Sequence, residues 1–202
     1  QPDVGTRTIM TYGLKAMERS GSKGWEHFFH NGEPLILSLK NLENVVEIEA
    51  VSGQTPVFAF ENPAVFTRII QQEPSAPCLC TSGQFHALDH YFIRILLRNP
   101  RQKLCYSGDY DPEGLLIADK LWSLYPDQVQ LMGYELDLYD RSLSDQPISA
   151  KRLRQLENLN NPLLRELGEE MKAKRKAGYQ EYVVDSLAEK VGLRIPSAEI
   201  VR

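Results

Sequence analysis

Two aspartates separated by one residue, Asp109 and Asp111, are the side chains of this sequence best suited to chemistry. They follow an apolar run at residues 103–107, and Pro112 then opens an apolar, helix-like segment. Hard divalent cations such as Mg²⁺ prefer oxygen ligands, which two carboxylates at a strand end supply. The pattern predicts a metal site in outline, although an isolated Asp-x-Asp is usually a turn or a solvated pair.

The elements that must position these carboxylates alternate regularly along the chain. Apolar runs that predict strands lie at 57–60, 78–81, 103–107 and 129–133. Helical patterns lie between and after them, at 63–71, 86–97 and 112–124. This order predicts an α/β, Rossmann-like fold with a mostly parallel four-stranded sheet flanked by helices.

The segments outside this core are less regular. Helical patterns alone fill 150–157, 162–176 and 179–191, while 134–147 is rich in turn residues. Near the start we expect short helices at 9–17 and 25–29, a strand at 35–39, and a short helical pattern at Leu42 and Val45.

These patterns divide the chain into three predicted parts. They are an N-terminal segment at 1–50, a catalytic core at 51–148 and a C-terminal helical extension at 149–202. The chain begins with Gln1 rather than Met, so we expect it to be a piece of a longer protein. Residues 1–50 would then be the remnant or linker of a preceding domain.

Composition limits the classes of function. The chain has 202 residues, 42% of them hydrophobic, and a formal net charge of −4. A protein that only coats nucleic acid is usually basic, whereas an enzyme can combine a local basic face with a metal. No apolar run approaches the roughly 20 residues of a membrane helix, so no membrane partner is expected. The odd set Cys78, Cys80 and Cys105 predicts reduced, buried thiols and a cytoplasmic protein.

Glu61 adds a third carboxylate at a comparable position, directly after the strand at 57–60. In parallel sheets, catalytic groups gather beyond the carboxyl ends of the strands, and neighbouring strands lie about 4.8 Å apart. If the strands at 57–60 and 103–107 are neighbours, Glu61 faces Asp109 and Asp111. Three such carboxylates repel one another unless a cation neutralises them. Alternatively, Glu61 merely precedes a helix cap, where acidic residues are favoured.

Three motifs together resemble the Toprim domain of topoisomerases, bacterial primases and related nucleases. Residues 58–63 read FAFENP, residues 80–84 read CTSGQ, and residues 108–114 read GDYDPEG. The pattern is most similar to the JetD-like nucleases of the Wadjet plasmid-defence systems, which are relatives of topoisomerase VI. The resemblance extends from about residue 35 to about residue 190 and implies a Toprim catalytic core.

The resemblance also implies roles for individual residues. Glu61, Asp109 and Asp111 would be catalytic and would bind Mg²⁺ or Mn²⁺, with Glu61 as metal ligand or general acid/base. Glu113 would extend the metal motif, although many relatives of this group lack it. The substrate-binding residues would be Gly83, Gln84 and His86. His86 and His90 have a spacing that metal sites can use, but no HExxH pattern accompanies them.

The implied function is a metal-dependent DNA endonuclease that cleaves phosphodiesters with a metal-activated water. It would be the effector subunit of an SMC-like anti-plasmid complex, so its partners would be DNA and the SMC-like ATPase subunits. A homodimer is left open. The alternatives are a non-cleaving Toprim-like nucleic-acid-binding or scaffold module, and a Toprim enzyme of other chemistry, either an RNA-maturing nuclease or topoisomerase-like. None of the nine tyrosines is marked by a motif as a nucleophile.

Overall fold

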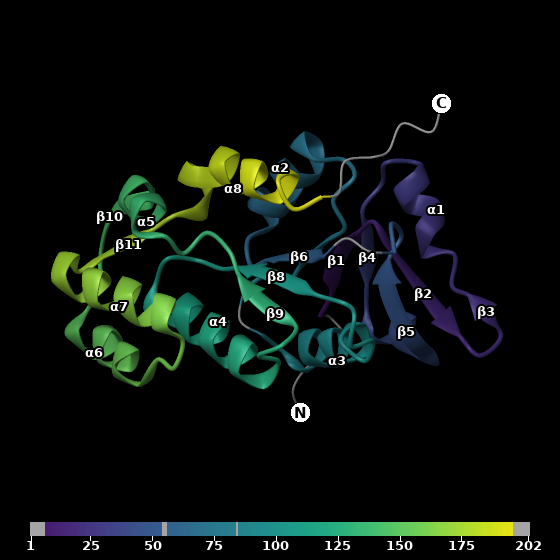
Figure 1. The fold of residues 1–202 in the computed structure, drawn as a ribbon, viewed down its shortest axis with the longest axis horizontal. Coiled ribbons are helices and arrows are strands. Elements are labelled where there is room, and N and C mark those ends of the chain that lie inside the picture. The colour runs from purple at the N-terminus through teal and green to yellow at the C-terminus, as the bar shows by residue number, and fades with distance from the viewer. Residues whose placement is uncertain (1–6, 54–55, 84, 196–202) are drawn as a thin grey trace.

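A six-stranded sheet forms the centre of the molecule (Figure 1). The structure is a computed structural model that describes residues 7–53, 56–83 and 85–195. The strands lie in the order β4-β1-β7-β6-β8-β9. They are β4 (Leu35–Leu37), β1 (Ile9–Tyr12), β7 (Cys78–Cys80), β6 (Val57–Phe60), β8 (Leu104–Ser107) and β9 (Val129–Leu131). Strands β7, β6, β8 and β9 are parallel, and β1 is antiparallel to both of its neighbours. The predicted mixed α/β fold with a mostly parallel, helix-flanked sheet is confirmed, but the sheet has six strands rather than the predicted four, because β1 and β4 of the N-terminal part pair onto it.

Helices cover both faces of this sheet. Helices α2 (Pro63–Gln72) and α8 (Val184–Gly192) lie on one side, and α3 (Ala87–Leu96) and α4 (Pro112–Leu124) lie on the other (Figure 1). The chain therefore leaves β6 toward one face and leaves the adjacent β8 toward the opposite face. The carboxyl ends of these two strands form a topological switch point, which is where open α/β sheets bind ligands.

The central strands are buried along their whole length. Every residue of β6, β7 and β8 is buried, which is why these strands read as continuous apolar runs rather than alternating ones. Cys78, Cys80 and Cys105 are free thiols inside this core, as predicted. A strand buried on both faces has few polar positions, so its functional groups are displaced to the loops beyond its ends.

The N-terminal part contains strands where we predicted a helix at 9–17, so that prediction is wrong. It forms β1 and β2 (Leu14–Glu18), separated by Gly13. Gly13 has φ of +68°, and a Cβ there would lie 2.9 Å from the Pro77 Cα, so the chain turns tightly at this point. Hydrogen bonding of β1 to β7 on one side and β4 on the other outweighs the local helical spacing.

A second sheet of three strands follows from this turn. It has the order β3 (Gly21–Ser22), β2 and β5 (Val45–Ala50). The predicted helix at 25–29 is confirmed as α1 (Trp25–His30), and the helical pattern after the strand at 35–39 is confirmed only as the short 3₁₀ helix η1 (Leu39–Leu42). Val45 instead begins β5, which pairs with β2.

The C-terminal part is mainly helical, as predicted, but it contains a small sheet. The stretch expected to be turns forms helix α5 (Leu136–Ser142) and strand β10 (Leu143–Pro147). Strand β10 pairs with β11 (Lys176–Gly178), so sequence-distant residues stabilise it. The remaining elements are α6 (Ala150–Leu153), η2 (Arg154–Asn158), α7 (Pro162–Lys174) and η3 (Gln180–Val183).

One backbone contact ties this C-terminal part to the loop after β8. The Gly178 N–H donates to the Tyr110 carbonyl over 2.9 Å, between the two aspartates of the sequence motif. Side chains of α6 and η3 can therefore reach the carboxyl end of the sheet. Within the described ranges, none of the helices is both long and apolar enough to cross a membrane.

Candidate functional site

Glu61 and Asp109 lie side by side beyond the ends of β6 and β8. The two strands pair in parallel up to Phe60 and Ser107, so the next residues of both leave the same edge of the sheet. The Asp109 N–H donates to Glu61 Oε2 over 3.2 Å. A Cβ on Gly108 would lie 2.9 Å from this same oxygen, so a larger residue there would push the carboxylate away from the loop.

Burial makes negative charge costly at this pair. Glu61 is only 8% exposed, and burial raises the pKa of its carboxyl group above the usual range. The Asp109 N–H opposes this rise, and the charge of Asp111 adds to it. The pKa of Asp109 rises to about 7, first because of burial and then because of repulsion from Glu61 and Asp111. Both carboxylates lack a basic partner among the described residues, so a cation would stabilise their ionised forms.

Asp111 has a second, structural role as the N-cap of α4. Its Oδ1 accepts a hydrogen bond of 2.8 Å from the Gly114 N–H, and Pro112 occupies the first turn. Gly114 cannot be replaced without strain, because its Cβ would lie 2.3 Å from the Asp109 carbonyl oxygen. The second glycine of the motif thus packs the start of α4 against the loop that carries both aspartates.

Arg152 from α6 joins Asp111 to Glu113. One of its terminal nitrogens donates to Asp111 Oδ2 over 2.6 Å and also contacts Glu113 Oε2. Its Nε lies 3.1 Å and 3.0 Å from the two Glu113 oxygens, and Gln155 donates to Oε1 over 3.1 Å. The hydrogen bond from Arg152 lowers the pKa of Glu113. Asp111 and Glu113 therefore share an arginine partner. For Glu61 and Asp109, the described residues supply no basic partner.

The residues expected to bind substrate lie in different places. Gly83 is beside the acidic cluster, since its N–H donates to the Glu61 carbonyl over 3.1 Å and its φ of +98° favours glycine. Gln84 lies outside the described residues. His86 precedes α3, where its N–H donates to the Asp89 carboxylate over 2.8 Å. The pocket that it lines contains none of the four clustered acids; its other walls are Arg7, Thr8, Thr81, Ser82, Leu88 and Asp89.

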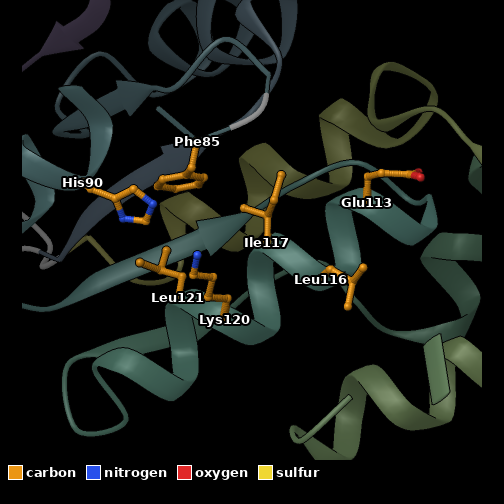
Figure 2. Close-up of a pocket in the computed structure, with 7 residues that line it drawn as sticks. All are labelled: Phe85, His90, Glu113, Leu116, Ile117, Lys120 and Leu121. Atoms are coloured by element: carbon orange, nitrogen blue, oxygen red, sulfur yellow. The ribbon is translucent and has the colours of Figure 1, made fainter. Parts of the chain in front are cut away.

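A pocket of about 260 Å³ borders the cluster on the side of Glu113 (Figure 2). In Figure 2, Phe85 and His90 lie at one end and Glu113 at the other, with Ile117 between them. The Phe85 ring centroid is 5.4 Å from that of His90 and 5.8 Å from that of Tyr106. Burial and the neighbouring Lys120 lower the pKa of His90, which favours its neutral form. The remaining walls are Leu116, Lys120 and Leu121.

The fold adds three functional candidates that sequence reasoning did not single out. The first is Arg152. The second is Glu181 in η3, which accepts a hydrogen bond of 2.7 Å from Asn62 Nδ2 and helps to raise the pKa of Asp109. The third is Tyr134, whose hydroxyl accepts from the Gly108 N–H over 2.8 Å. Asn62 and Glu181 are 119 residues apart, so no local spacing could have marked that contact.

The donor set fits a hard divalent cation in its chemistry. All four clustered side chains are carboxylates, and Glu61 and Asp109 repel each other with no neutralising partner from the part of the chain that the structure describes. Across the described ranges, no three His, Cys, Asp or Glu side chains are already arranged as a metal site. In this arrangement Arg152 binds oxygens of Asp111 and Glu113 that a metal could otherwise use.

A known family profile covers most of the chain. The profile of the family described as "Protein of unknown function C-terminus (DUF2399)" matches residues 35–191. This span contains Glu61, the two motif aspartates, Arg152 and Glu181. No curated protein matches the chain. Since the family profile covers well over half of its residues, the chain belongs to the DUF2399 family.

Proposed function

We propose that this protein is a Toprim-type, metal-dependent DNA endonuclease of the JetD-like kind. One observation carries the proposal: the buried Glu61 and the half-buried Asp109 meet at the switch point between β6 and β8, without a basic partner among the described residues. A cluster of this kind destabilises the fold unless a cation binds there. A scaffold or a simple binding module has no need of that destabilisation.

Glu61, Asp109 and Asp111 would hold Mg²⁺ or Mn²⁺, with Glu113 as a further ligand. When bound, the metal polarises the phosphodiester and lowers the pKa of a water. The chain's own groups orient the site. The Asp109 N–H and the Gly83 N–H fix the two ends of Glu61, one at its carboxylate and one at its carbonyl. The glycine at position 83 also leaves space for the phosphate backbone to approach.

The two tyrosines beside Gly108 are unsuited to act as nucleophiles. Tyr106 and Tyr134 lie closest to Gly108, and both side chains are fully buried. Burial raises the pKa of both hydroxyls well above the usual range, which makes them poor nucleophiles. This argues against Tyr106 and Tyr134 themselves as nucleophiles and leaves a metal-activated water as the attacking group in this proposal.

In this proposal the protein acts in the cytoplasm on DNA, as the effector subunit of an SMC-like anti-plasmid complex. That assignment of partners rests on the resemblance of the three sequence motifs. An RNA-maturing nuclease would use the same carboxylates, so a matched RNA duplex belongs in the assay as a competing substrate.

The test is cleavage of circular plasmid in Mg²⁺ or Mn²⁺ by wild type, Glu61→Gln and Asp109→Asn. Both substitutions keep the side-chain size and remove the charge, so we expect at least about a 100-fold loss of cleavage. Asp127→Asn is the matched control, because Asp127 is exposed and precedes β9 at the amino ends of the strands. Equal cleavage by all four proteins would contradict the proposal.

A further inference from the structure

Arg152 makes contacts that a merely structural arginine would not need. Its guanidinium bridges Asp111 and Glu113, which belong to the N-terminal turn of α4, while Arg152 itself lies on α6. Among the described residues it is the only basic side chain that forms an ion pair with the four clustered acids. Within the described part of the chain, the positive charge of the cluster therefore comes from one residue of the C-terminal segment.

The oxygens that Arg152 occupies are the ones a metal would need. Asp111 Oδ1 is engaged by the Gly114 N–H, which leaves Oδ2 as the ligand atom, and Arg152 binds Oδ2. Both Glu113 oxygens also accept hydrogen bonds from Arg152. One terminal nitrogen of the guanidinium contacts Asp111 and Glu113 together, as a coordinated cation would.

A divalent cation has an advantage over Arg152 at this position. It carries twice the charge, and it can also neutralise Glu61 and Asp109, which have no ion pair with the guanidinium. The Arg152 side chain is 38% exposed, so it can swing into solvent without burying an unpaired charge. Once a metal has released Arg152 from the carboxylates, its planar guanidinium can bind a phosphate through two parallel hydrogen bonds.

We propose that Arg152 is a displaceable counter-ion that holds the Asp111–Glu113 pair until a divalent cation binds, and that its guanidinium then moves to a phosphate of the DNA. The inference rests on the proposed metal site and adds to it a residue that no sequence motif marks. It predicts two effects of opposite sign: removing Arg152 strengthens metal binding and weakens DNA binding.

Metal binding is tested by calorimetric titration of Mn²⁺ into wild type, Arg152→Gln and Arg154→Gln, without DNA. Arg154 is the matched control, because it is exposed, lies two residues further on and forms no ion pair with the cluster. We expect Arg152→Gln to bind Mn²⁺ about three- to tenfold more tightly than Arg154→Gln. Arg152→Lys keeps the charge without the fork, so its affinity should lie between them, and it serves if Arg152→Gln does not fold.

DNA binding is then measured in Ca²⁺ by fluorescence anisotropy on a short duplex, across a range of salt concentrations. A lost phosphate contact lowers the slope of log K against log salt by about one, and we expect this for Arg152→Gln relative to Arg154→Gln. Equal Mn²⁺ affinities, or equal salt slopes, for these two variants would overturn the inference while leaving the metal site intact. If wild type binds no Mn²⁺, or Asp109→Asn binds it equally well, the proposed function fails and the inference with it.

Discussion

Asp109 is the residue whose chemistry depends most on its neighbours. The sequence motif predicts a metal-binding carboxylate, but the raised pKa comes from burial and from Glu61 and Asp111, which the fold brings together. Without a metal, the folded protein binds a proton at Asp109 far more tightly than the unfolded chain does. Ionisation of this side chain therefore opposes folding.

This linkage predicts how stability depends on pH. The pKa of Asp109 in the folded protein, about 7, exceeds the value of 3.8 for the free side chain. The stability that protonated Asp109 contributes to the folded state is therefore fully present below pH 4 and is lost as pH rises through 7. In the metal-free protein, the loss across the full window is on the order of 4 kcal/mol. The measurement is urea unfolding of wild type and Asp109→Asn from about pH 4.5 to 8, which spans most of this window. We expect the variant to lose less stability across this range; parallel curves would contradict the assigned pKa.

Residue roles were predictable only where the sequence carries a local signal. Glu61, Asp109 and Asp111 stand out because each follows an apolar run at a strand end. Arg152 and Glu181 carry no such signal, since they lie in elements that are ordinary polar helices by pattern. Their placement depends on the pairing of β10 with β11 and on the contact between Gly178 and Tyr110.

At the scale of elements, α2 and α4 were predictable because capping residues define where they begin. Each starts with a capping side chain followed by proline, at Asn62-Pro63 and Asp111-Pro112. The predicted helix at 9–17 was wrong because its residues satisfy their backbone hydrogen bonds in strands from distant parts of the chain. Helix starts are set locally, whereas the extra strands depend on long-range pairing.

Asn62 gives a test at this scale, because it both caps α2 and contacts η3. Its Oδ1 accepts from the Ala64 N–H over 2.8 Å, and its Nδ2 donates to Glu181. Asn62→Ala should cost about 1–2 kcal/mol through the lost cap. Asn62→Asp keeps the cap but places a negative charge against Glu181, so it should also destabilise the protein.

Glu181→Gln also relieves repulsion at Asp109 in either background, so it should recover more stability in Asn62→Asp than in Asn62→Ala. Chemical unfolding of the two single variants and both double variants measures this difference. If Asn62→Asp is as stable as wild type with Glu181 present, the two side chains do not interact in solution.

At the scale of the whole molecule, the site is assembled from two parts of the chain. The parallel sheet supplies Glu61 and Asp109 at its switch point, and the C-terminal elements supply Arg152 and Glu181. The alternation of strands and helices predicted the sheet, but its two additional strands, β1 and β4, come from the N-terminal segment. A mechanism inferred from the sequence motif alone would omit Arg152, which binds carboxylate oxygens of Asp111 and Glu113.

The most direct measurement is the anomalous scattering of Mn²⁺ in crystals of the protein grown or soaked with the metal. We predict a peak between Glu61 and Asp109, with Asp111 in reach of the ion and the Arg152 guanidinium displaced from Asp111 Oδ2. The same experiment on Asp109→Asn should lose the peak. A manganese peak on His86 or His90 in the wild-type crystal, with the four carboxylates free of metal, would contradict the account.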